Sequence, residues 1–127
     1  MKKAIWVVAV VVAAVLIFGI YSLITANKII EMDEDVGSGA EVVTRGDFIA
    51  STHEVAGSAL LIKEDGQRIV RFENFETING PNLHIYLSSD LNARDFVDLG
   101  EIKATKGNVN YEIPEGPDLD KYNKVLV

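Results

Sequence analysis

An uncharged apolar run near the amino terminus constrains this chain more than any other feature. It covers residues 4–24 and reads AIWVVAVVVAAVLIFGIYSLI. A helix rises about 1.5 Å per residue, so this run is long enough to cross the roughly 30 Å hydrocarbon core of a bilayer. Because lipid offers the backbone no hydrogen-bond partners, we expect a helix despite the many β-branched valines. The sequence therefore predicts an N-terminal membrane anchor, with one transmembrane helix, over residues 1–26.

The charges on the two sides of the run predict its orientation. Lys2 and Lys3 precede the run, whereas all 19 Asp and Glu residues follow it. The positive-inside rule then places the amino terminus in the cytoplasm and the rest of the chain outside it. A cleaved signal peptide is the alternative, but its apolar region would be shorter, and residues 24–26 (ITA) match a small-x-small cleavage site poorly. We expect an uncleaved, single-pass signal anchor in the cell membrane, with the lipid bilayer as its partner and an extracytoplasmic domain.

Net charge and cysteine content exclude several classes of function. Two of the 12 basic residues precede the apolar run, so 10 basic residues stand against 19 acidic ones from residue 25 onward, a net charge of −9. Such an acidic domain repels nucleic acid, and we expect no nucleic-acid partner. The chain is cysteine-free, which excludes disulfides, thiolate nucleophiles and cysteine-ligated metals. No nucleotide or flavin fingerprint is present, and we predict no cofactor.

The segment after the anchor differs in composition from everything that follows it. Residues 27–40 (NKIIEMDEDVGSGA) are acidic and then rich in Gly and Ser. This composition predicts an acidic/Gly-Ser linker. A calcium loop is disfavoured, since the sixth residue from Asp33 is Ser38 instead of glycine and the twelfth is Thr44 instead of glutamate. We expect the folded domain over residues 41–127.

Short runs of β-forming residues, separated by turn residues, fill that domain. Asp65-Gly66 between two such runs is a strong hairpin signal. Two further runs alternate apolar and polar residues, which predicts strands with one buried face. The candidate strands are residues 58–63, 68–72, 83–87, 98–102, 108–113 and 122–127. Six or so strands at this spacing predict an all-β fold, a small antiparallel β-sandwich or barrel.

A series of turn and strand residues between positions 46 and 127 has the order and spacing of a known family. The matching positions are Phe48, His53, Gly57, Asn74, Phe75, Asn79, Gly80, Pro81, Asn82, Leu83, Tyr86, Asp98, Gly100, Tyr111, Pro114 and Tyr122. Together they resemble the DM-thirteen domain, which is described as an electron-transfer domain and in bacterial members often follows a membrane anchor. The resemblance implies a role in electron transfer or redox processes at the cell surface.

The resemblance also implies a residue that this sequence does not contain. In the family, the strand after Tyr122 continues through a Trp-Cys or similar pair, and the redox role rests on that cysteine. The sequence ends at Val127, before that position.

His53 and His84 are the two histidines of the chain and its candidate metal ligands. Two imidazoles supply half of a zinc or copper site, and catalytic zinc needs three protein ligands. In a strand, Glu54 would point to the opposite face from His53 and could not join it. We expect His84 on the solvent face of its strand. Metal binding through His53 and His84 is therefore the third functional hypothesis.

The remaining motifs give no catalytic residues. The sequence contains no Ser-His-Asp spacing, no H-E-x-x-H and no distinctive pair of carboxylates, so we predict that the protein is not an enzyme. The leading hypothesis is a membrane-tethered extracytoplasmic β domain associated with electron transfer at the cell surface. The alternative is a non-catalytic binding or adhesion module that docks another envelope or cell-surface protein.

Overall fold

The computed structural model describes residues 12–17, 29–51 and 53–127. Residues 12–17 are helical. The other residues of the predicted membrane span over residues 4–24 lie outside the described residues; they are residues 4–11 and 18–24. Within the described ranges, no helix has the length and apolar character that a membrane span requires. From residue 29 onward the described chain consists of strands and turns.

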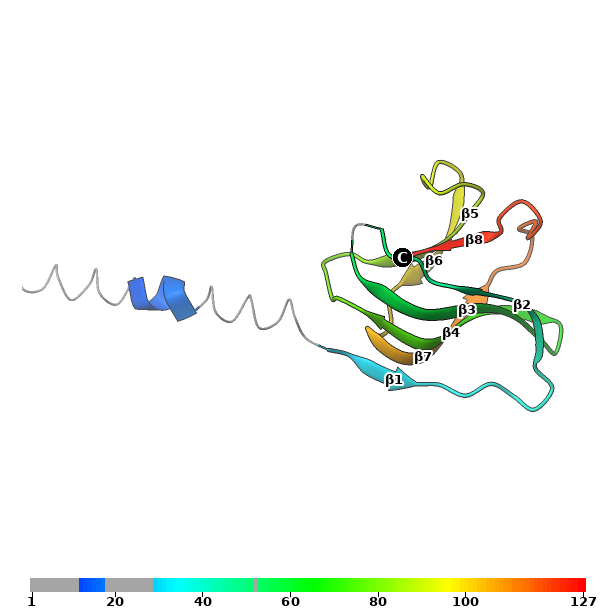
Figure 1. Cartoon of the computed structure of the whole chain (residues 1–127), viewed down its shortest axis with the longest axis horizontal. Helices are drawn as coiled ribbons and strands as arrows, with labels where there is room; N and C mark the ends of the chain where they lie inside the picture. The colour runs from blue at the N-terminus through cyan, green and yellow to red at the C-terminus, as the bar shows by residue number, and fades with distance from the viewer. Residues whose placement is uncertain (1–11, 18–28, 52) are drawn as a thin grey trace, which may run out of the picture.

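Two open sheets pack face to face and make up this β domain (Figure 1). Sheet A has the strand order β1-β7-β4-β3-β2, and sheet B has the order β6-β5-β8. Neighbouring strands are antiparallel, except that β1 and β7 are parallel. The strands are β1 (Glu31–Asp33), β2 (Glu41–Asp47), β3 (Val55–Glu64), β4 (Gln67–Thr77), β5 (His84–Ser88), β6 (Phe96–Glu101), β7 (Lys106–Ile113) and β8 (Lys124–Leu126). Of the two architectures predicted, the structure is the sandwich and not a closed barrel.

The β3–β4 hairpin organises sheet A, and it confirms the Asp-Gly prediction. Asp65 and Gly66 have φ values of 48° and 80°, as a type I′ turn requires. Farther along, the hairpin register shifts where Gly57 (φ 104°) lies against Asn74 (φ 50°). A Cβ atom on Gly57 would lie 2.6 Å from the carbonyl oxygens of Glu73 and Asn74, so this irregularity needs glycine.

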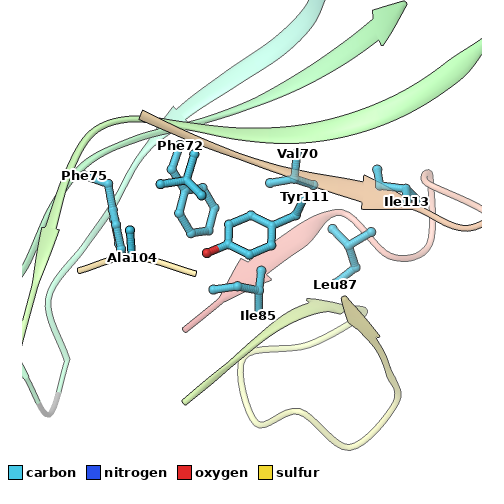
Figure 2. Packing of buried hydrophobic residues seen from close by; sticks show 9 residues of the cluster. Val70, Phe72, Phe75, Ile85, Leu87, Ala104, Tyr111 and Ile113 are labelled. Atoms are coloured by element: carbon cyan, nitrogen blue, oxygen red, sulfur yellow. The ribbon is translucent and has the colours of Figure 1, made fainter. Parts of the chain in front are cut away.

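The main core lies between the two sheets, where residues of β4 and β7 meet residues of β5 (Figure 2). The alternation predicted for residues 83–87 and 108–113 is confirmed by the buried side chains of Ile85, Leu87, Val109, Tyr111 and Ile113, whereas Leu83 is half-buried and precedes β5. Phe72 is at the centre, and its ring packs 4.8 Å from that of Phe75 and 5.1 Å from that of Tyr111. The buried cluster consists of Val70, Phe72, Phe75, Ile85, Leu87, Ala104, Val109, Tyr111 and Ile113.

Part of the segment predicted as a linker belongs to the sandwich. β1 lies beside β7, and the Ile30 amide donates to Thr105 Oγ1 at 2.9 Å. Val36 and Ala40 then pack over Leu60 on the outer face of sheet A. A strand of three residues is too short to show periodicity, and its acidic side chains resemble those of a solvated linker. The β domain of the structure therefore begins before Glu41.

Candidate functional site

Most positions that carry the family resemblance have architectural roles in the structure. Gly57 and Asn74 form the hairpin irregularity, and Phe75 belongs to the core. Tyr111 is buried, and its hydroxyl accepts a hydrogen bond from the Lys103 amide at 3.0 Å. Six more lie in turns or loops next to strands: Asn79, Gly80, Pro81, Asn82, Leu83 and Pro114. The family pattern thus largely encodes the sandwich itself.

The two histidines lie on different parts of the fold. His53 is exposed in the loop between β2 and β3, whereas His84 begins β5 in sheet B. Among residues 12–17, 29–51 and 53–127, no group of three or more His, Cys, Asp and Glu residues is placed to hold a metal ion. His84 instead pairs with Asp98 of the neighbouring strand.

The outward face of sheet B brings together three residues singled out by the sequence and one that was missed. His84 and Tyr86 alternate along β5 with buried residues, so they face away from the core. Phe96 and Asp98 lie on the adjacent β6, where Asp98 is the register partner of Tyr86. The rings of Tyr86 and Phe96 stack with centroids 4.1 Å apart and planes 27° apart. We call these four residues (His84, Tyr86, Phe96 and Asp98) the outer patch.

Hydrogen bonds hold the polar end of the outer patch. Asp98 Oδ1 accepts from the Gly100 amide at 2.8 Å, and Asp98 Oδ2 lies 3.0 Å from His84 Nδ1. The Gly100 amide and the His84 ring lower the pKa of Asp98, in that order of size. Asp98 is therefore ionised at neutral pH and favours a proton on His84 Nδ1.

The apolar end of the outer patch is open to solvent. Phe96 is 42% exposed, and Tyr86 lies against it. Exposed aromatic rings next to fixed polar groups are typical of surfaces that contact another molecule. Phe96 was missed in the sequence because it precedes the predicted strand 98–102, and only the β5–β6 register places it beside Tyr86.

A second charged cluster joins two loops next to sheet B. Asp95 accepts a hydrogen bond from the Tyr122 hydroxyl at 2.9 Å and pairs with Lys121 Nζ at 2.9 Å. The Lys121 ammonium lowers the pKa of Asp95 most, followed by the Tyr122 hydroxyl, and Asp95 in turn raises the pKa of Lys121. Asp95 and Lys121 follow no motif, and only the folding of the two loops brings them together. The cluster fixes Tyr122, the last position of the family pattern.

Comparison with known families assigns residues 47–127 to a model described as Electron transfer DM13. The matched range begins at the last residue of β2 and includes β3 to β8, the main core and the whole outer patch. No curated protein and no solved structure matched the chain.

Proposed function

Because the chain belongs to the Electron transfer DM13 family, the one that its turn and strand residues resemble, we propose that its β domain takes part in electron transfer at the cell surface. The match over residues 47–127 is the observation that carries this proposal. We propose a role as a binding partner of redox proteins and not as an enzyme, because no catalytic motif occurs in the sequence.

We further propose that the domain is tethered to the membrane from outside the cytoplasm. The support is the uncharged run of residues 4–24 and the Lys2-Lys3 pair before it. Protease is added to cells whose outer boundary is permeable to it and whose cytoplasmic membrane is intact. The protease should then digest the domain and leave the anchor. Full protection of the domain in such cells would contradict this topology.

The outer patch is the surface that we propose for contact with a redox partner. Its aromatic pair supplies apolar contact area, and the Asp98 carboxylate supplies a fixed negative charge. The described domain, residues 29–127, is acidic. It contains all 19 acidic residues of the chain but only nine of its 12 basic residues, because Lys2, Lys3 and Lys28 precede it. A positively charged partner would be attracted to such a domain and held at the aromatic pair.

Reduction of ferricyanide by intact cells tests the proposed function, because ferricyanide accepts electrons without crossing the membrane. Cells that lack the chain should reduce it several-fold more slowly, and the wild-type chain should restore the rate. The Phe96→Asp variant should restore it poorly, whereas Ile49→Asp should restore it fully. Ile49 is a matched control because it is 88% exposed and lies in a loop of the other sheet. Equal rates with and without the chain would refute the electron-transfer role.

A second candidate function is a binding or adhesion module that docks an envelope protein without redox exchange. The exposure of Phe96 favours this candidate as well. Measuring cross-linking and ferricyanide reduction in the same cells distinguishes the two functions. If cross-linking to a partner is lost in Phe96→Asp while ferricyanide reduction is independent of the chain, the second candidate is correct.

A further inference from the structure

A groove opens between the two sheets on the side where β2 and β8 lie. Its volume is about 270 Å³. The lining is mainly apolar and comes from both sheets: Phe48, Leu61 and Val70 on one side, Leu87 and Val125 on the other, and Leu119 from the preceding loop. β8 runs above β2 in Figure 1, and both strands contribute residues to the lining of the groove, Gly46 from β2 and Val125 from β8. We call it the side groove.

Small residues keep the side groove open. Gly46 of β2 is the register partner of Ala59 of β3, which packs against the main core. Directly opposite residues of an antiparallel pair point to the same face, so Gly46 faces the groove. A Cβ atom built on Gly46 would meet no atom within 4 Å. The open space is therefore next to a glycine that could carry a larger side chain without a collision.

β2 itself is the edge of sheet A beside the groove. In the described residues it pairs only with β3, and all seven of its residues are exposed. An edge strand presents a row of N–H and C=O groups along its unpaired side. Only an extended backbone matches that row, and its alternate side chains would point toward the groove. A free strand edge above an apolar groove is the arrangement that binds peptides by strand addition.

We propose that the β2 edge and the side groove bind an extended segment of a partner protein as an additional strand of sheet A. The segment would carry apolar residues at alternate positions, which enter the groove, because strand side chains alternate between faces. The positions between them would be basic, because the described domain has 19 acidic residues against nine basic ones. This site is separate from the outer patch, which lies on the opposite face of sheet B. Its failure would leave the electron-transfer proposal intact.

Fluorescence anisotropy with a defined peptide tests the proposal on the full chain in detergent micelles. The probe is a fluorescein-labelled heptapeptide that alternates lysine and valine, as long as the seven residues of β2. A peptide of the same composition with the valines in one block controls for charge alone. We expect saturable binding of the alternating peptide and at least tenfold weaker binding of the block peptide. Equal binding of the two peptides, or no saturable binding of the first, would overturn the proposal.

Two glycine variants place the peptide in the groove. Gly46→Leu fills the side groove and should weaken binding at least tenfold. Gly39→Leu is the matched control, since a Cβ there meets only Asp65 Oδ1 at 4.0 Å and Gly39 does not line the groove. Its affinity should equal that of the wild type. Unchanged binding in Gly46→Leu would overturn the site.

Peptides methylated on alternate backbone nitrogens test the main-chain contacts. A strand added at an edge turns every second N–H toward its neighbour. Methylation of one alternate set should therefore abolish binding, and methylation of the other set should leave it unchanged. If both methylated peptides bind as well as the parent, strand addition is excluded.

Discussion

The two edges of sheet A are built in opposite ways. At the β1 edge, one side-chain bond and one backbone bond tie the chain to β7: Asn108 Nδ2 donates to Asp33 Oδ1 at 2.6 Å, and the Glu34 backbone amide donates to the Asn108 carbonyl oxygen at 2.8 Å. At the β2 edge, the strand is exposed along its whole length and borders an apolar groove. In the described residues both outermost strands have an unpaired outer side, but β1 has only three residues, whereas β2 offers seven exposed residues beside the groove. We call the short, tied β1 edge the closed edge and the long β2 edge the open edge.

Arg71 illustrates how the closed edge is held. Its side chain is only 10% exposed, and Nη1 donates to the Glu34 carbonyl oxygen at 2.7 Å and to Asn110 Oδ1 at 3.0 Å. Its counterpart near the open edge, Arg45, is 54% exposed and donates to Ser58 Oγ at 3.1 Å. A buried guanidinium therefore links Glu34, the residue after β1, to the centre of the sheet, whereas the guanidinium of Arg45 near the open edge is exposed to solvent.

The largest difference in stability between the edges should come from substituting leucine for one glycine at each edge: Gly107 of β7, which lies against β1, and Gly46 of β2. Gly107 has a φ of 115°, and a Cβ there would collide with the Met32 carbonyl oxygen of β1. Gly107→Leu should therefore lower the free energy of unfolding by about 3 kcal/mol or more. Gly46→Leu, with open space around its Cβ, should change it by less than about 0.5 kcal/mol. Chemical unfolding of the full chain in micelles, followed by circular dichroism, measures both; equal losses would break the comparison.

The arginines should show a smaller difference of the same sign. Arg71→Met keeps the apolar stem but leaves the Glu34 carbonyl oxygen and Asn110 without their charged donor, and we expect a loss of about 2 kcal/mol. Arg45→Met removes an exposed contact and should cost less than about 1 kcal/mol. The same unfolding experiment applies. A larger loss for Arg45→Met would mean that the open edge is the better anchored one.

The sequence predicted the centre of this molecule better than its edges. Asp65-Gly66 fixes its turn through local backbone preferences, and residues 83–87 and 108–113 alternate because one face is buried. β1 and the side groove arise from contacts between distant positions, such as Ile30 with Thr105, which leave no periodic pattern. The outer patch was predicted in part: His84, Tyr86 and Asp98 were singled out, but their association with Phe96 depends on strand register.

A change in the hairpin between the edges should affect both alike. Gly66→Val places a β-branched residue at a φ of 80°, which should destabilise the domain by about 1–2 kcal/mol. The two hairpin strands pair with the rest of the sheet on either side, β3 with β2 and β4 with β7. Amide exchange should therefore accelerate equally at both edges of sheet A. Faster exchange at one edge alone would show that the edges unfold independently of the hairpin.

The smallest effect should appear in acid, beside the open edge. Tyr122 lines the side groove and is held by Asp95, whose pKa is lowered from 3.8 mainly by Lys121. A lowered carboxyl pKa stabilises the fold above the unfolded-state value, and this contribution is lost as the pH falls below about 3.8. The melting temperature of Asp95→Asn should therefore fall slightly less than that of the wild type below this pH. Parallel curves down to pH 2 would show that the pair adds nothing to stability.

Hydrogen exchange at the two edges, with and without the alternating lysine–valine peptide, tests the central claim most directly. The full chain in micelles is compared residue by residue. We expect the peptide to slow amide exchange about tenfold within residues 41–47 and to leave residues 31–33 unchanged. Unchanged exchange in β2, or equal slowing in β1 and β2, would contradict the account of one closed edge and one open edge.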